Sequence, residues 1–192
     1  PWRPRSRSTT GVAEPTPAEA DRQLEELCRV LNYFNVGYIV FGSHVARLNG
    51  VPLETVDVDV VPAANAENLQ RLVEALNLLS PRWRVEGVPG GMRIDGGLEV
   101  RHFLGDSAAI GLITRLGPID VVLAPKGFEN GYGALVGRAE RMRLGDVEIR
   151  VGSLADLVRS KELLRRAKDV EHLRVLYELR PDLGGGSPEP SA

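Results

Sequence analysis

The chain has 192 residues, 43% of them apolar and 26% charged, with a net charge of −2. These values suit one ordinary soluble globular domain and exclude a strongly basic nucleic-acid binder. One cysteine, Cys28, excludes an internal disulfide and fits a reducing compartment. No apolar run approaches the ~20 residues that span a bilayer, and no signal-peptide pattern opens the chain, so we expect a cytoplasmic protein without membrane contacts.

Composition changes along the chain predict its organisation. Proline, serine, threonine and arginine dominate residues 1–15, which we expect to form a flexible arm. A globular core follows over 16–152, then a helical C-terminal part of the same unit over 153–180. Glycine and proline over 181–192 predict a second flexible tail.

The first half of the chain alternates predicted helices and strands. Thr16 and Glu19 form a capping box, with Pro17 at the first helical position, and so predict the start of a helix. Tyr38–Phe41 is predicted to be a buried strand. A second helix is expected over His44–Leu48, a strand over Val56–Val61, and a third helix after Asn65.

The second half begins strand-like and ends helical. Apolar runs predict strands at 83–85, 98–104 and 119–123, and a hairpin at 141–151 turns at Gly145-Asp146. Ser153 begins a helix whose apolar spacing continues to Leu176. The fold class expected is therefore mixed α/β (α+β), with a mixed sheet flanked by helices and a helical C-terminal end.

Asp57 and Asp59 are the most informative pair of residues. They lie two apart in a valine-rich segment, so on a strand both carboxylates emerge from the same face. Two anions on an apolar strand repel each other and resist desolvation. A divalent cation between them removes this conflict, and oxygen ligands suit Mg²⁺ or Mn²⁺. The alternative is a pair of exposed turn aspartates.

Two further features strengthen the metal hypothesis. Asp120 lies within the apolar run Ile119–Leu123, and a neighbouring strand can bring it beside the pair as a third metal ligand. Gly42 and Ser43 follow a strand and precede a helix, a place where backbone and hydroxyl groups bind phosphate. Taken alone, Gly42-Ser43 is equally well a plain helix cap.

Basic residues gather near the C-terminal end. Lys161, Arg165 and Lys168 fall at helical spacing and form one stripe if the helix is continuous. A solvated helix face is the ordinary explanation of such a stripe. Beside a metal site it also suits a triphosphate or an RNA backbone.

Together these motifs resemble the polymerase-β-type nucleotidyltransferases, and within them the AbiEii and MenT-like toxins of bacterial toxin–antitoxin systems. The resemblance covers roughly residues 21–178. It is carried by Gly42-Ser43, Ala46, Gly50, Thr55-x-Asp57-x-Asp59, the Gly117–Asp120 strand, the Ser153–Lys161 helix and Lys168-Asp169.

The resemblance implies a role for each matched position. Asp57, Asp59 and Asp120 would bind Mg²⁺ or Mn²⁺, and Asp120 would also orient the attacking hydroxyl. Gly42, Ser43, Lys161, Arg165 and Lys168 would bind the nucleotide, with Lys161 and Asp169 also catalytic. The implied reaction adds nucleotides from an NTP to an RNA acceptor, expected to be the tRNA 3′ end, and a cognate antitoxin protein is the implied partner.

Other functions fit the same residues. The acceptor can instead be a protein hydroxyl or a small molecule such as an aminoglycoside, or the fold can be an inert binding module. We also hypothesise that phosphorylation of Ser43 or Thr55 inactivates the protein, since a dianion would repel the triphosphate.

Overall fold

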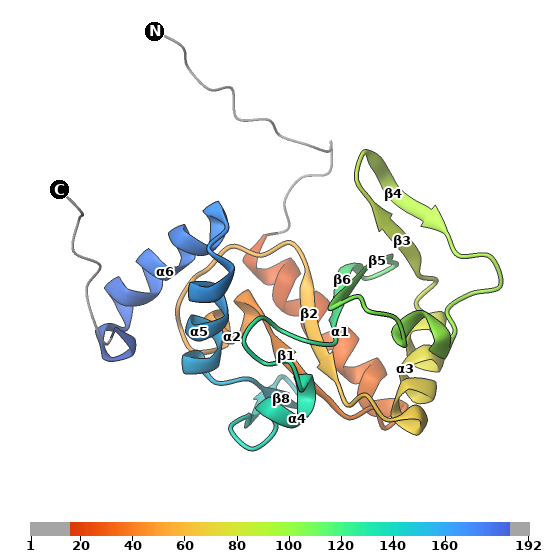
Figure 1. The fold of residues 1–192 in the computed structure, drawn as a ribbon, viewed down its shortest axis with the longest axis horizontal. Coiled ribbons are helices and arrows are strands. Elements are labelled where there is room, and N and C mark those ends of the chain that lie inside the picture. The colour runs from red at the N-terminus through yellow and green to blue at the C-terminus, as the bar shows by residue number, and fades with distance from the viewer. Residues whose placement is uncertain (1–15, 185–192) are drawn as a thin grey trace, which may run out of the picture.

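The computed structural model describes residues 16–184, which form one mixed eight-stranded sheet with six α-helices packed around it (Figure 1). This arrangement confirms the expected mixed α/β fold with a helical C-terminal end. The expected arm over 1–15 lies outside the described residues, as does the expected tail from residue 185 onward.

The helices and strands have the following bounds. The helices are α1 (Pro17–Tyr33), α2 (Ser43–Leu48), α3 (Ala66–Leu78), α4 (Gly131–Leu135), α5 (Leu154–Leu164) and α6 (Ala167–Leu179), with 3₁₀ turns η1 (Val100–Phe103) and η2 (Pro181–Leu183). The strands are β1 (Tyr38–Phe41), β2 (Val58–Pro62), β3 (Arg82–Val85), β4 (Val88–Arg93), β5 (Ala109–Thr114), β6 (Gly117–Val122), β7 (Glu140–Leu144) and β8 (Val147–Val151).

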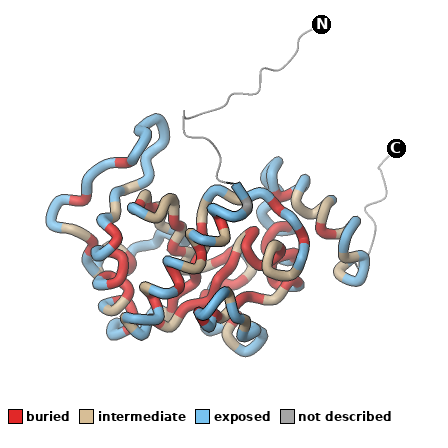
Figure 2. Tube along the Cα trace, turned by 180° about the vertical axis from the view of Figure 1, so that it is seen from behind, coloured by how far each residue is buried: buried red, intermediate tan, exposed pale blue. Residues whose placement is uncertain are grey.

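The sheet places β2 at its centre, in the order β4-β3-β5-β6-β2-β1-β8-β7. β2 runs antiparallel to β1 and parallel to β6. Central strands are buried, whereas the β3–β4 hairpin is largely exposed and projects from the body of the molecule (Figures 1 and 2). Asn68 ties the two central strands together, because its side chain bonds both Gly37 and Ala63 at their ends.

Local signals fixed the helix starts correctly. The side chain of Thr16 accepts from the Glu19 amide and the Glu19 carboxylate accepts in return, which completes the expected capping box. The side chains of Asn65 and Ser153 accept from the backbone amides of Asn68 and Asp156, and so cap α3 and α5. The predicted β7–β8 hairpin is also confirmed.

The strand expected over 98–104 was wrong. This segment contains η1, and Leu98 and Phe103 are both buried although five residues apart. Alternating strand geometry would put them on opposite faces. A turn brings both inward, with the Glu99 amide donating to Nδ1 of His102.

Three other boundaries differ from expectation. The strand expected from Val56 begins at Val58, because the Thr55 hydroxyl bonds the Asp57 carbonyl oxygen (2.9 Å) and Val56 is left exposed. The expected continuous C-terminal helix breaks at Arg165, whose φ of 50° is left-handed. η2 occupies the start of the tail expected from residue 181.

Candidate active site

Asp59 and Asp120 lie side by side at the centre of the sheet. Asp59 on β2 is the register partner of Asp120 on β6, so the parallel pairing places the two carboxylates on the same sheet face. Asp57, just before β2, completes the cluster and is tied to Thr55 through the bond from the Thr55 hydroxyl to its carbonyl oxygen. The structure therefore places the three carboxylates that the sequence singled out along one cavity.

Mutual repulsion and burial dominate the electrostatics of this cluster. Burial, then the charges of Asp57 and Asp120, raise the pKa of Asp59 to about 7. Burial also raises the pKa of Asp120, although hydrogen bonds from Arg84 act against the rise. Three carboxylates in one enclosed place are costly to ionise, which is the condition that a bound cation relieves.

Gly42 is required by the position of Asp59. Its φ is +63°, and a Cβ at residue 42 would lie 1.8 Å from Oδ2 of Asp59. Only glycine leaves room for the carboxylate at the end of β1. Ser43 follows as the first residue of α2, with its hydroxyl oxygen 3.5 Å from Nδ1 of His172.

Lys161, Asp169 and Arg166 form an ionic group in which Lys161 and Asp169 are buried and Arg166 is exposed. Nζ of Lys161 donates to Asp169 (3.2 Å), and Nε of Arg166 donates to the same carboxylate (2.6 Å). Burial raises the pKa of Asp169, but the hydrogen bonds from Arg166 and Lys161 outweigh it and the net shift is downward. Asp169 is thus an ionised anchor that fixes the Lys161 ammonium in place.

His172 is a member of the site that the sequence did not reveal. It lies on α6, one turn after Asp169, and its Nδ1 is 3.0 Å from Nζ of Lys161. Burial and the neighbouring ammonium lower the pKa of His172 to about 4, so the ring is neutral at pH 7 and accepts from Lys161. Helical spacing from Asp169 is the signal that would have suggested it.

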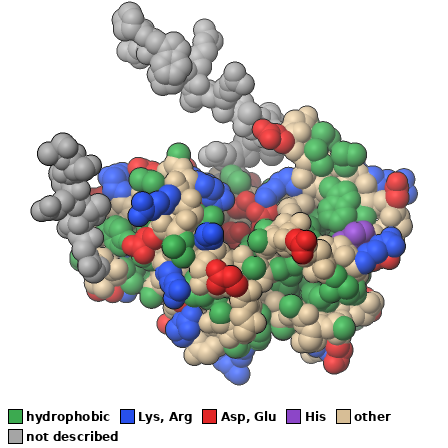
Figure 3. Space-filling model, viewed as in Figure 1, with side chains coloured by type: hydrophobic (Ala, Val, Ile, Leu, Met, Phe, Trp, Pro, Cys, Tyr) green, Lys and Arg blue, Asp and Glu red, His purple; other side chains and the backbone are tan. Residues whose placement is uncertain are grey.

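A cavity of about 820 Å³ joins these groups. Its volume is typical of a small-molecule site. In Figure 3 a hollow between the C-terminal helices and the β3–β4 hairpin holds acidic side chains, with basic ones around it. Five basic residues line the cavity: Arg47, Lys126, Lys161, Arg166 and Lys168.

The predicted nucleotide-binding residues fall partly within this cavity. Gly42, Ser43, Lys161 and Lys168 line it, and so does Asp169. Arg165 is exposed and is not among the lining residues, because the left-handed break directs it away and its Nε donates to the Glu162 carbonyl oxygen. The single stripe of Lys161, Arg165 and Lys168 required a continuous helix, and the helix breaks at Arg165. Arg166 lines the cavity, whereas Arg165 does not.

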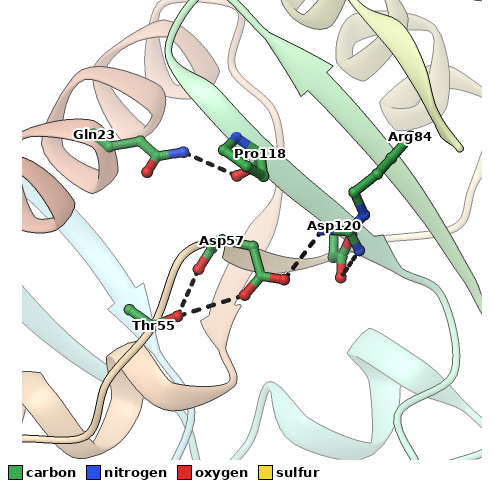
Figure 4. A network of polar contacts seen from close by, with 6 residues as sticks. All are labelled: Gln23, Thr55, Asp57, Arg84, Pro118 and Asp120. Carbon is green, nitrogen blue, oxygen red and sulfur yellow. Dashed lines mark hydrogen bonds and ion pairs between the residues drawn. The ribbon is translucent and has the colours of Figure 1, made fainter. Parts of the chain in front are cut away.

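The three carboxylates are of the chemical type that binds a divalent cation. Three oxygen-donating side chains are the usual ligands of Mg²⁺ or Mn²⁺. Across residues 16–184, however, no three acidic, histidine or cysteine side chains stand together as a ready-made metal site. The guanidinium of Arg84 donates to both Asp57 and Asp120 (Figure 4).

His44, next to Ser43, makes a testable contribution to acid stability. It is 1% exposed, and burial lowers its pKa to about 4, although a hydrogen bond with the backbone of Ala20 acts against this shift. The unfolded chain binds this proton near pH 6.5, so the stability is full above that pH and falls as the pH drops toward 4. Between pH 7 and pH 4, the unfolding free energy of His44→Leu should fall by about 3 kcal/mol less than that of the wild-type protein. Urea denaturation at both pH values measures it, and equal losses in both proteins would contradict it.

Comparisons with known proteins agree on the fold. No protein-family model matches the sequence, and no curated protein does. A candidate nucleotidyltransferase from Thermotoga maritima is 18% identical with a TM-score of 0.53, covering 89% of this chain and all of its own. The antibiotic-resistance factor ANT(2'')-Ia is 15% identical (TM-score 0.53, 88% of both chains). The lincosamide adenylyltransferase LnuA, solved with lincomycin, is 12% identical (TM-score 0.52, 82% of this chain and 96% of its own).

These similarities extend along almost the whole described chain but do not single out the AbiEii and MenT-like toxins. Among residues 16–184, no helix combines the length and hydropathy that a bilayer-spanning segment requires. The chain therefore has the fold of the polymerase-β-type nucleotidyltransferases, as its sequence motifs predicted.

Proposed function

We propose that the protein is a metal-dependent nucleotidyltransferase. The observation that carries the proposal is the in-register pairing of Asp59 with Asp120, with Asp57 beside them, in a cavity lined by five basic residues. A cavity that is lined both by acidic groups for a cation and by basic groups for phosphates suits nucleotidyl transfer.

Each group has a distinct part in this reaction. Asp57, Asp59 and Asp120 would hold Mg²⁺ or Mn²⁺, which when bound neutralises charge on the triphosphate. Asp120 orients the acceptor hydroxyl and takes its proton as the oxygen bonds to the α-phosphorus. The bond from the α-phosphorus to the bridging oxygen breaks, and pyrophosphate leaves. Lys161 and Lys168 stabilise its negative charge.

The first candidate acceptor is the 3′ end of tRNA, with the protein acting in the cytoplasm as the toxin of a toxin–antitoxin system. Support comes from the Gly117–Asp120 and Ser153–Lys161 motifs and from the basic residues of α5 and α6. The cavity also includes Ser43 and Thr55, so phosphorylation of either would place a dianion beside the carboxylates. A cognate antitoxin would be the natural partner.

The second candidate acceptor is the hydroxyl of a small molecule. LnuA and ANT(2'')-Ia, which are antibiotic-related by name, match this fold over nearly their whole length, and ANT(2'')-Ia has also been solved with adenylyl-2''-tobramycin. The fold therefore occurs in a protein that has been solved with an adenylylated small molecule.

One labelling experiment separates the two acceptors. Each of the four α-³²P-labelled NTPs is incubated with the protein, Mg²⁺ and either total tRNA or a panel of aminoglycosides and lincosamides. Labelled tRNA supports the first acceptor, and a labelled antibiotic supports the second. Label in neither, together with no metal-dependent NTP binding by calorimetry, would contradict the proposal and favour an inert module of the same fold.

A further inference from the structure

Arg84 reaches the acidic cluster from the exposed β3–β4 hairpin. Its Nη1 donates to Oδ2 of Asp57 (3.1 Å), and its Nη2 donates to Oδ2 of Asp120 (2.6 Å). Figure 4 shows the guanidinium lying between the two carboxylates. One positive group thus bridges two of the three proposed metal ligands.

Gly111 on β5 leaves space for the Arg84 side chain to cross the sheet. β5 lies between β3 and β6, and Gly111 on β5 is the register partner of Asp120. A Cβ at residue 111 would lie 2.8 Å from Nε of Arg84 and 3.1 Å from its Nη2. The absence of a side chain at Gly111 therefore opens the path from β3 to the carboxylates.

The contact has an electrostatic consequence. Carboxylates crowded together need a positive partner, and Arg84 supplies one charge where a divalent cation supplies two. The guanidinium between Asp57 and Asp120 occupies part of the acceptor capacity of their oxygens, and its positive charge repels an approaching cation. The guanidinium and the cation must therefore compete.

We infer that the Arg84 guanidinium is the counter-ion of the acidic cluster when no metal is bound, and that it must move away before a divalent cation binds. This inference rests on the proposed function, since it assumes that Asp57 and Asp120 are metal ligands. Arg84 is about one-third exposed, so its side chain has solvent to move into. The arginine balances the negative charge of Asp57 and Asp120 and lowers the affinity for metal alone.

Mn²⁺ binding without nucleotide tests the inference. Free Mn²⁺ is measured by electron paramagnetic resonance in titrations of the wild-type protein, Arg84→Gln, Gly111→Ala and Arg82→Gln. We expect Arg84→Gln and Gly111→Ala to bind Mn²⁺ about tenfold more tightly, the first by removing the competing charge and the second by displacing it. Arg82→Gln is the matched control, because Arg82 lies on the same strand but donates to the Gly91 carbonyl oxygen.

Thermal unfolding gives a second readout that does not need activity. In EDTA, Arg84→Gln should melt at a lower temperature than the wild-type protein, because its carboxylates lack a counter-ion. Added Mn²⁺ should raise the melting temperature of Arg84→Gln more than that of the wild-type protein.

Mn²⁺ affinities equal to or weaker than wild type in both Arg84→Gln and Gly111→Ala would overturn the role of Arg84 alone. Failure of every variant to bind Mn²⁺ would overturn the proposed metal site as well.

Discussion

Asp59→Asn is expected to reduce nucleotidyl transfer by about 10³-fold or more while making the folded protein more stable. Activity falls because the amide cannot replace a charged metal ligand at the centre of the site. Stability rises because Asp59 is crowded by Asp57 and Asp120 and enclosed, which lifts its pKa to about 7. The substitution removes a charge that the folded state disfavours.

The pH dependence of this effect has a definite sign. Because the folded-state pKa of Asp59 lies above the ordinary value of 3.8, the folded protein holds this proton where the unfolded chain has lost it. The wild-type protein therefore loses stability as pH rises from about 4 to 7. Asp59→Asn should be more stable than wild type by about 1 kcal/mol or more at pH 8, and should show little of this gain at pH 4.

Two measurements check the prediction. Urea denaturation in EDTA at pH 4 and pH 8 gives the difference in unfolding free energy, and the labelled-NTP assay gives the rate. Transfer within tenfold of wild type would remove Asp59 from the catalytic centre. A stability difference that is the same at both pH values would show that the carboxylate is not crowded as the structure indicates.

Gly42→Ala is expected to damage both the fold and the site. The new methyl group would stand 1.8 Å from Oδ2 of Asp59 on a backbone with φ of +63°. The left-handed conformation costs about 1 kcal/mol and displacement of the carboxylate adds to it, so we expect a loss of about 2–4 kcal/mol. Transfer should fall nearly as far as in Asp59→Asn, because the carboxylate is pushed from its position.

Gly50→Ala is the matched control for this substitution. Gly50 also has a positive φ of +82°, but no atom lies within 4 Å of the place where its Cβ would stand. It should lose about 1 kcal/mol and keep its activity. Equal effects of the two substitutions on transfer would mean that backbone strain, and not the contact with Asp59, explains the loss in Gly42→Ala.

Much of the fold followed from short-range sequence signals. The cap at Thr16, the strand Tyr38–Phe41 and the hairpin around Gly145 are set by residues close together in the chain, so periodicity and turn chemistry suffice. The middle of the chain was harder to predict. β4 contains two glycines and a proline and β5 contains one glycine, which weakens the alternating pattern that marks a strand.

The candidate site divides in the same way. Asp57, Asp59 and Asp120 stood out because carboxylates inside apolar strands are costly without a cation. Arg166 was missed because no sequence signal predicts the left-handed backbone conformation at Arg165. This conformation ends α5 and changes the direction of the chain before α6. His172 was left unassigned because its contact with Lys161 depends on how the two helices pack.

By itself, the sequence determined which residue types could perform the chemistry: the acidic pair at 57 and 59, the lone Asp120, the glycine at 42 and the basic residues near the C-terminus. Local periodicity carries that information, because neighbours in the chain decide which face a side chain takes. Only the tertiary structure decided that Asp120 stands in register with Asp59, that α5 ends at Leu164, and that Arg84 crosses over Gly111 to reach the carboxylates. These contacts join segments dozens of residues apart, and their geometry is set by strand pairing and helix packing across the whole sheet.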